Sequence, residues 1–359
     1  GRGGEQATTE EDGSQQGSLM EAAAKVYHNL VASSADNRLS LSKDFKVLTR
    51  LIEMGAKRAP GSTSAVGAVF EMCKETGECR QELLMQQELI GALVSAAKLG
   101  SERQKELACG ALAVLGHKDE FGASPPDSDL VNLNISAQDG AFEALALLVL
   151  EGSPQQATPA TSILGNLVMS SGAFVKNSLA ETKGFLSKVF RQIRGAAPLH
   201  RGLSLRLLYH LVKGDSYLVG MVVKEPGMVK VLSEMLEGGT NTQRRYACLC
   251  IRQMMMFDKR MVAQVGDFNQ GRIFKSTLLL FDEHDSSLAL AAVLMLASLA
   301  SSPLNRERFV KVERLVLGVC EMITRREAPH HLLAGRVLSL LAGMEGSRAA
   351  LVGLRGVRE

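Results

Sequence analysis

The segment ATSILGNL, Ala160–Leu167, begins with a small side chain and ends seven positions later with a large apolar one. Such pairs recur along the whole chain, and their large residues are successively 42, 43, 52, 44, 43, 45 and 42 positions apart. Units that stack on one another need a small side chain wherever their helices cross closely. The period therefore predicts one elongated solenoid in place of several globular domains. The eight pairs are Ala23/Leu30, Ala65/Met72, Ala108/Leu115, Ala160/Leu167, Ser204/Leu211, Ala247/Met254, Ala292/Leu299 and Ala334/Leu341.

Composition and spacing inside each unit predict helices. Leu, Ala, Val and Met must build the interior, because aromatic residues make up 4% of the chain and Trp is absent. In the unit that ends at Leu115, apolar residues also stand at Ala108, Ala111 and Leu112, which form one face of a helix. The chain is therefore expected to be all-α.

Two further signals mark helix boundaries. Gly140, Gly184 and Gly227 each lie 27 residues before the large residue of their unit, and Gly271 lies 28 residues before its own. A glycine that recurs between two helices indicates a sharp turn that a side chain would obstruct. The segment Ser101–Gln104 predicts a capping box at the start of the last helix of its unit.

Several segments resemble armadillo repeats. The small-residue position of that family, its Asn-Leu near the end of the third helix, its following Arg and its turn glycine all have counterparts. The resemblance covers residues 19–359 and implies an all-α, right-handed superhelical α-solenoid of about eight repeats. It is carried by Asp139–Ser153 (DGAFEALALLVLEGS), Ala160–Ser171 (ATSILGNLVMSS), Pro226–Met254 (PGMVKVLSEMLEGGTNTQRRYACLCIRQM) and Ala291–Val310 (AAVLMLASLASSPLNRERFV), with the following arginines Arg38, Arg80, Arg260, Arg306 and Arg348.

Two stretches depart from the repeat. Residues 1–18 have almost no apolar content and are expected to form a disordered N-terminal tail. The one interval of 52 residues locates an insertion at about residues 119–134, where two prolines, a glycine and several aspartates predict a projecting loop. The loop is interpreted as a tolerated surface excursion, with a partner contact as the alternative.

No sequence motif indicates catalysis. The chain contains no phosphate-binding loop, zinc-protease motif, nucleophile elbow or calcium loop. His330 and His331 are adjacent, so their side chains diverge on a helix and cannot share a metal ion. The acidic cluster at residues 282–285 is interpreted as negative charge at a helix start, with a metal site as the alternative. We expect a non-enzymatic protein with no cofactor and no resident metal.

In proteins that this chain resembles, the third helices line a concave groove, and their Asn side chains bond the backbone of an extended peptide. The row just before the large residues is the one to examine, together with the positions one and two turns earlier. Asn and Gln suit this task because an amide can donate and accept together. Arg and His in the same rows favour an acidic ligand. The expected groove residues are Asn29, Asn166, Arg206, His210, Arg245 and Gln253.

The leading hypothesis is a protein-interaction scaffold that binds a partner segment in this groove. Without Trp, the Trp–Asn arrays of nuclear-import receptors are missing, which argues against that function. One alternative is a regulator of another enzyme, such as an Hsp70 nucleotide-exchange factor or a small-GTPase regulator. Another is nucleic-acid binding, because residues 182–359 carry a net charge of +11 against −8 for residues 1–181. The basic residues are dispersed and aromatics are scarce there, so nucleic acid is disfavoured.

Cysteine usage and hydropathy bear on location. Six cysteines are few for this length and several lie inside apolar helical runs, which favours a reducing compartment. A cytoplasmic location is therefore expected, with the nucleus as an alternative. The longest apolar run, Leu288–Ala300, is 13 residues and too short to cross a bilayer.

Overall fold

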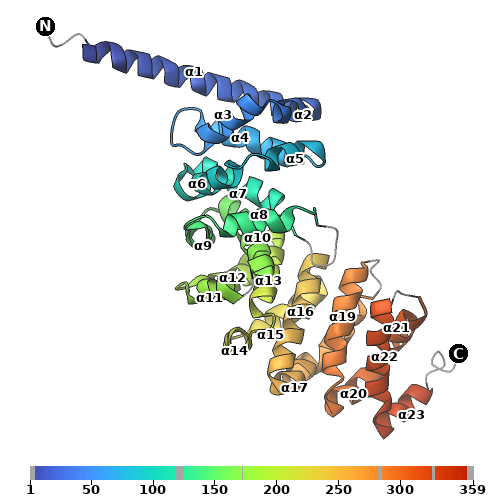
Figure 1. The fold of residues 1–359 in the computed structure, drawn as a ribbon. Helices are drawn as coiled ribbons and strands as arrows, with labels where there is room; N and C mark the ends of the chain where they lie inside the picture. The colour runs from blue at the N-terminus through green and yellow to red at the C-terminus, as the bar shows by residue number, and fades with distance from the viewer. Residues whose placement is uncertain (1–4, 119–123, 172, 282–284, 326–327, 354–359) are drawn as a thin grey trace. The chain divides into compact units, whose positions relative to one another are not determined.

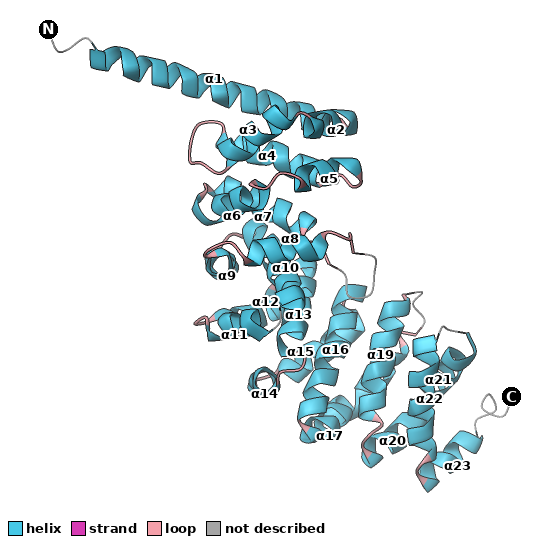
Figure 2. Ribbon diagram, in the orientation of Figure 1, coloured by secondary structure: helices cyan, strands magenta, loops and turns pink. Residues whose placement is uncertain are grey.

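A computed structural model describes residues 5–118, 124–171, 173–281, 285–325 and 328–353 (Figure 1). Throughout these residues the backbone is helix or loop (Figure 2). The chain divides into two compact units, residues 1–188 and residues 189–359, and each is considered by itself. The expected all-α solenoid is confirmed within each unit, because the helices follow one another in sets of three.

In the first unit, the third helix of each repeat packs on the third helix of the next, and the same holds for the second helices of consecutive repeats. The third helices are α1 (Glu5–Ser33), α4 (Ser62–Cys73), α7 (Glu102–Leu115) and α10 (Pro154–Ser171). The second helices are α3 (Phe45–Gly55), α6 (Leu89–Leu99) and α9 (Ala141–Glu151). The first helices are α2 (Ala35–Lys43), α5 (Glu78–Leu84), α8 (Ser128–Ser136) and α11 (Ala173–Glu181).

The second helix α12 (Phe185–Gly195) contains residues of both units. The second unit then repeats the arrangement. Its third helices are α13 (Pro198–Val212), α16 (Asn241–Phe257), α19 (Ser286–Leu299) and α22 (Ala328–Ala342). Its second helices are α15 (Met228–Gly238), α18 (Arg272–Leu278), which follows the short helix η1 (Phe268–Gly271), and α21 (Glu313–Arg325). Its first helices are α14 (Ser216–Lys224), α17 (Lys259–Asp267), α20 (Pro303–Val310) and α23 (Glu345–Gly353).

The predicted pairs of a small and a large residue are buried in all but the first repeat. From Ala65/Met72 onward, both members of each pair are at most 1% exposed. In α1 the prediction is wrong by one residue, since Leu30 is 42% exposed and Ala23 is also exposed. The buried pair is Ala24 and Val31. Three consecutive alanines and two consecutive apolar residues allow the seven-residue spacing in two registers. Packing against α4 selects the register that buries Ala24 and Val31.

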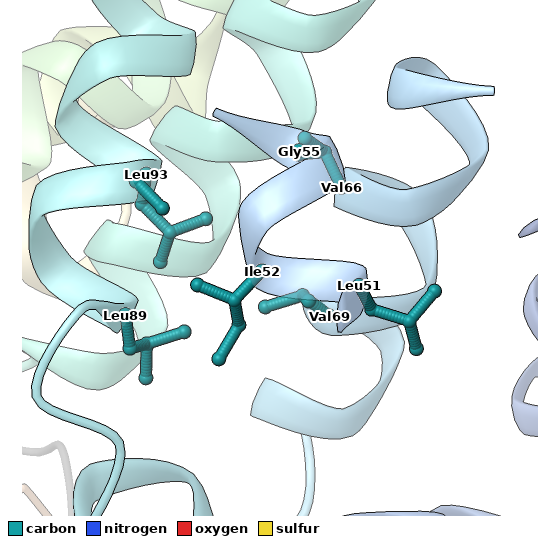
Figure 3. A pocket seen from close by; sticks show the side chains of 8 residues that line it. Leu51, Ile52, Gly55, Val66, Val69, Leu89 and Leu93 are labelled. Carbon is teal, nitrogen blue, oxygen red and sulfur yellow. The ribbon is translucent and has the colours of Figure 1, made fainter. Parts of the chain in front are cut away.

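The junction between two successive repeats is tightly filled. Between α3, α4 and α6 only a small cavity of about 10 Å³ remains. Figure 3 shows Ile52 of α3 directed towards Leu89 and Leu93 of α6, while Leu51 points to the opposite side of α3. Dispersion contacts of this density are what hold repeats of a solenoid in register, since each repeat touches only its neighbours.

The turn glycines are confirmed. Gly140, Gly184, Gly227 and Gly271 have φ of 71°, 79°, 74° and 77°, the left-handed region in which a side chain is strained. Each precedes a second helix, so the recurring glycine sets the direction in which that helix leaves the turn.

The expected family arginines cap third helices. The guanidinium of Arg38 donates to Val31 O at 2.7 Å, that of Arg306 to Ala300 O at 2.7 Å, and that of Arg348 to Ala342 O at 3.1 Å. These carbonyls have no partner inside their helix, so a cation there is favourable. Arg80, on the first helix α5, instead donates to Leu115 O at the end of α7, the third helix of its own repeat, at 2.5 Å. Arg260 departs from the pattern, because it is exposed and pairs with Asp258.

The capping box at Ser101 and Gln104 is confirmed, and the Gln of this box has a second role. Its side-chain amide also donates to Lys57 O in the preceding repeat at 3.2 Å. Thr240 and Gln243 form the same box at the start of α16, and Gln243 donates to Pro198 O at 2.6 Å. Each capping box therefore fixes the start of its helix, and the Gln of the box also holds that helix against the preceding repeat.

Two expected loop segments are partly helical. The tail expected over residues 1–18 is helical from Glu5, because α1, once packed on α4, continues towards its N-terminus at little cost. The loop expected over 119–134 is too long, because α8 begins at Ser128. Val131 and Ile135 lie one helical turn apart in α8 and are buried. Residues 1–4 and 119–123 lie outside the described residues.

Candidate partner-binding surface

We define the third-helix face as the residues just before each large buried residue of a third helix, with the positions one and two turns earlier. The six expected groove residues divide between the units: Asn29 and Asn166 lie in the first, and Arg206, His210, Arg245 and Gln253 in the second. The structure brings the last four together on the neighbouring helices α13 and α16.

Burial differs sharply among these six. Asn29 is exposed and Arg245 is half-buried. Asn166 is 0% exposed, and Arg206, His210 and Gln253 are 4–6% exposed. A residue that contacts a partner segment must reach solvent. Asn29 and Arg245 do so, whereas the other four expected groove residues are buried.

In the first unit, glycines on the third-helix face receive large side chains from the repeat before. A Cβ added to Gly67 would lie 2.9 Å from His28 Cε1, and one added to Gly110 would lie 2.8 Å from Phe70 Cε2. His28 and Phe70 therefore lie directly over backbone of the next third helix. His28 therefore makes the contact that Phe70 makes one repeat later, and its neighbour Asn29 is exposed.

In the second unit, a buried aromatic cluster lies between α13 and α16, beside the third-helix face. The ring centroids of Tyr209 and Tyr246 are 5.9 Å apart, and the His210 ring lies 4.9 Å from the first and 6.0 Å from the second. Two cations flank the tyrosines: Lys213 Nζ lies 5.6 Å from the Tyr209 ring, and Arg245 Cζ lies 5.1 Å from the Tyr246 ring. Such cation–π contacts each contribute about 0.5–1 kcal/mol at accessible sites.

Arg245 is also held from the next repeat. Its Nη1 donates to Ser287 Oγ at 2.9 Å, and Ser287 Oγ donates to Asp285 Oδ1 at 2.6 Å. Asp285 in turn accepts from the backbone of Ser287 and Leu288 and so caps α19, as the sequence indicated for the acidic cluster. Burial acts to raise the pKa of Asp285, but the Ser287 hydroxyl, these backbone bonds and the charge of Arg245 lower it below its usual range. The other members of the cluster, residues 282–284, lie outside the described residues.

Three residues of this surface, Tyr209, Tyr246 and Ser287, were not predicted from the sequence. A signal for the tyrosines was present, because the chain has four Tyr in all and two of them fall on consecutive third helices, each within two positions of a repeat marker. Ser287 carried no signal, since its role depends on how α19 lies against α16.

The described residues offer little for metal or thiol chemistry. Nowhere in them do three or more His, Cys, Asp or Glu come together as a group that could hold a metal ion. Cys73, Cys79, Cys109, Cys248 and Cys250 are buried as free thiols. Burial raises the pKa of Cys109 to about 12, so its reactive thiolate is scarce at neutral pH.

Within the described residues, no individual helix has both the length and the apolar character to span a membrane. Only α8 and α9 taken together, bent by 93° where they meet, satisfy that test by length and composition.

Comparison with known proteins gives the class of fold. No family model matches the chain, and no curated protein matches it. An engineered protein of known structure is similar to it with a TM-score of 0.71 at 17% identity, over 94% of this chain and 78% of that one. A second engineered protein has a TM-score of 0.56 at 17% identity, over 71% and 99%. A designed armadillo repeat protein has a TM-score of 0.55 at 15% identity, over 70% and 99%. The chain has an armadillo-like repeat fold.

Proposed function

We propose that the chain is a non-enzymatic protein-interaction scaffold that binds a partner segment on its third-helix faces. Armadillo-like repeats are typical interaction scaffolds, and stacked helices present long surfaces of varied chemistry. In the first unit the exposed Asn29 would engage a peptide backbone, and in the second unit the half-buried Arg245 would favour acidic side chains. Asn166, Arg206, His210 and Gln253 are at most 6% exposed, so they would support this surface from beneath and would not touch the segment.

One observation carries the proposal for the second unit. Lys213 and Arg245 lie over two neighbouring tyrosine rings on consecutive third helices. Tyr209 and Tyr246 are 4% and 1% exposed, so these rings hold the two cations and do not meet a ligand themselves. Positive charge held in this way suits a segment with acidic side chains, because carboxylates pair with the cations. Arg245 is half-buried and so is the groove residue of this unit that a ligand meets first. Arg206 and His210, which are buried, would set the charge behind it.

A peptide array tests the proposal. Extended synthetic peptides rich in Asp and Glu are probed with the full chain. We expect Arg245→Glu to weaken binding about tenfold or more, since a hydrogen bond to a charged group contributes about 1.5–3 kcal/mol. Lys259→Glu, the same charge change on exposed α17, should leave binding unchanged.

A second variant separates the charge of Arg245 from its structural bond. Ser287→Ala removes the bond to Arg245 but keeps the cation, and we expect binding to persist. Acidic peptides that bind Arg245→Glu as tightly as the unaltered chain would remove the second-unit site from the proposal.

A further inference from the structure

The third helix α19 presents apolar side chains on the side that reaches solvent. Between residues 288 and 299, all residues are buried except Leu290, Leu294, Ala297 and Ser298. Their helical spacing places these four on one side of α19. We call Leu290, Leu294 and Ala297 the leucine stripe. Because α19 packs between α16 and α22, the open side is not created by an end of the stack (Figure 1).

The leucine stripe differs from the corresponding positions of other third helices. A helix on a protein surface usually turns polar residues towards solvent, but α19 contains no charged residue. In α4, α7, α10 and α13, the two positions that correspond to Leu290 and Leu294 hold polar residues or glycine. These pairs are Thr63/Gly67, Glu106/Gly110, Thr158/Ser162 and Gly202/Arg206. The stripe is therefore not a general feature of the repeat.

Two arginines of α16 border the leucine stripe. Corresponding residues of α16 and α19 are 45 positions apart, so Arg245 corresponds to Leu290 and Arg252 to Ala297. Since the two helices pack side by side, corresponding residues lie at about the same level (Figure 1). The hydrogen bond from Arg245 to Ser287, one turn before Leu290, agrees with this alignment. Cations and apolar surface are therefore neighbours on this face.

The charge of this face is positive. The four third helices of the second unit, α13, α16, α19 and α22, contain six arginines and no Asp or Glu. Arg252 is half-buried, and its guanidinium pairs with no acidic side chain among the described residues. A carboxylate of a partner complements such a face by charge-assisted hydrogen bonds. The stripe, in turn, favours an apolar side chain, because covering apolar surface is favourable in proportion to its area.

We propose that the second unit recognises an extended segment in which an acidic and an apolar side chain stand two residues apart. The carboxylate lies against Arg245 or Arg252, and the apolar side chain lies against the leucine stripe. Side chains two residues apart in an extended segment point the same way and are about 6.4–6.8 Å apart. Packed helices have axes about 8–10 Å apart, so such a pair fits side chains that meet between α16 and α19. The inference rests on the function proposed above and adds the sequence that a partner must carry.

Two extended acidic peptides test the inference by fluorescence anisotropy on the full chain. In one peptide a central glutamate has leucine two residues before it and two residues after it, so either direction of binding is allowed. The other peptide has serine at both positions. We expect the leucine peptide to bind about tenfold more tightly, since a leucine side chain leaves water on binding.

Variants of the stripe show where the leucine binds. Leu290→Ser/Leu294→Ser should weaken the leucine peptide to the affinity of the serine peptide and leave the serine peptide unchanged. Leu278→Ser/Leu317→Ser is the matched control, because these leucines are also half-buried but lie on the second helices α18 and α21. The control should keep the tenfold difference. Thermal unfolding midpoints show whether each variant is folded at the temperature of the measurement.

A photoreactive leucine in the peptide gives a second test that needs no variant. Its cross-links on the unaltered chain should map to α16 and α19, and cross-links confined to first or second helices would overturn the inference. Equal binding of the two peptides would overturn it too, while the proposed acidic site would stand. Absence of binding by both peptides would overturn the site as well. Sedimentation that shows a dimer, lost in Leu290→Ser/Leu294→Ser, would also count against it, because a second copy would then cover the stripe.

Discussion

Ala24 and Val31 lie seven positions apart on α1, and both are buried at 1% and 0% exposure. The neighbouring pair Ala23 and Leu30 has the same spacing but is exposed, because it faces away from the contact between α1 and α4. The first repeat therefore joins the stack through Ala24 and Val31, while Ala23 is exposed beside a groove between α1 and α3.

This register predicts unequal effects of two adjacent substitutions. Ala24→Leu forces extra atoms into a filled junction and should lower the free energy of unfolding by about 1–3 kcal/mol. Ala23→Leu places the same atoms at an exposed position and should change it by less than about 0.5 kcal/mol. Urea denaturation of both variants checks this, and equal destabilisation would contradict the register.

Removal of an arginine that caps a helix should cost more unfolding free energy than removal of an arginine from an exposed ion pair. Arg38 donates to Val31 O at 2.7 Å and pairs with Glu75 at 2.6 Å, with its side chain 18% exposed. Arg38→Ala should cost about 1.5–3 kcal/mol of unfolding free energy. Arg260→Ala breaks a pair whose arginine is 86% exposed and should cost under about 1 kcal/mol. Comparable losses in chemical denaturation would show that the carbonyl cap does not matter.

Substitution by alanine should destabilise the protein at a turn glycine but not at a helical glycine with open space around it. Gly227 has a φ of 74°, so Gly227→Ala should destabilise by about 1–2 kcal/mol. Gly238 ends α15, with no heavy atom within 4 Å of an added Cβ. Gly238→Ala should be neutral or stabilising by up to about 1 kcal/mol. Thermal unfolding midpoints measure both, and a neutral Gly227→Ala would rule out a requirement for the left-handed turn.

Asp285 should make part of the stability depend on pH. The folded pKa of this carboxyl lies below its unfolded value, so its contribution is present above the unfolded pKa of about 3.9 and is lost as pH falls through the folded pKa. Asp285→Asn keeps a good helix cap but removes the charge that faces Arg245. The variant should be less stable at neutral pH, and the difference should shrink below about pH 4. Urea denaturation across this range would contradict the account if the difference grew towards acid.

How far the sequence predicts this molecule depends on whether a feature is local. The positive φ at Gly140 or Gly227 was predictable, because the requirement lies in the backbone of that residue. The start of α8 was missed because prolines and aspartates masked the helical spacing of Val131 and Ile135. The choice between Ala23 and Ala24 was undecidable, since both satisfy the spacing and only the contact with α4 separates them.

The candidate site was less accessible to prediction than the fold. Arg206 and His210 fall in the expected rows, yet both are buried, and burial depends on everything packed around them. The pairing of Arg245 with Ser287 joins residues 42 positions apart and follows from how α16 and α19 pack. Spacing could select the rows of residues, and only the three-dimensional packing could say which members reach solvent.

Site-specific photo-cross-linking tests the proposed scaffold function most directly. A photoreactive amino acid is placed at Arg252 or Ser298, half-buried on the third helices α16 and α19, and at Lys230 or Lys259 on a second and a first helix. The tightest acidic peptide from the array is then added and the cross-links are mapped. The account predicts cross-links from Arg252 and Ser298 and none from Lys230 or Lys259. Cross-links confined to Lys230 and Lys259 would contradict binding on the third-helix face.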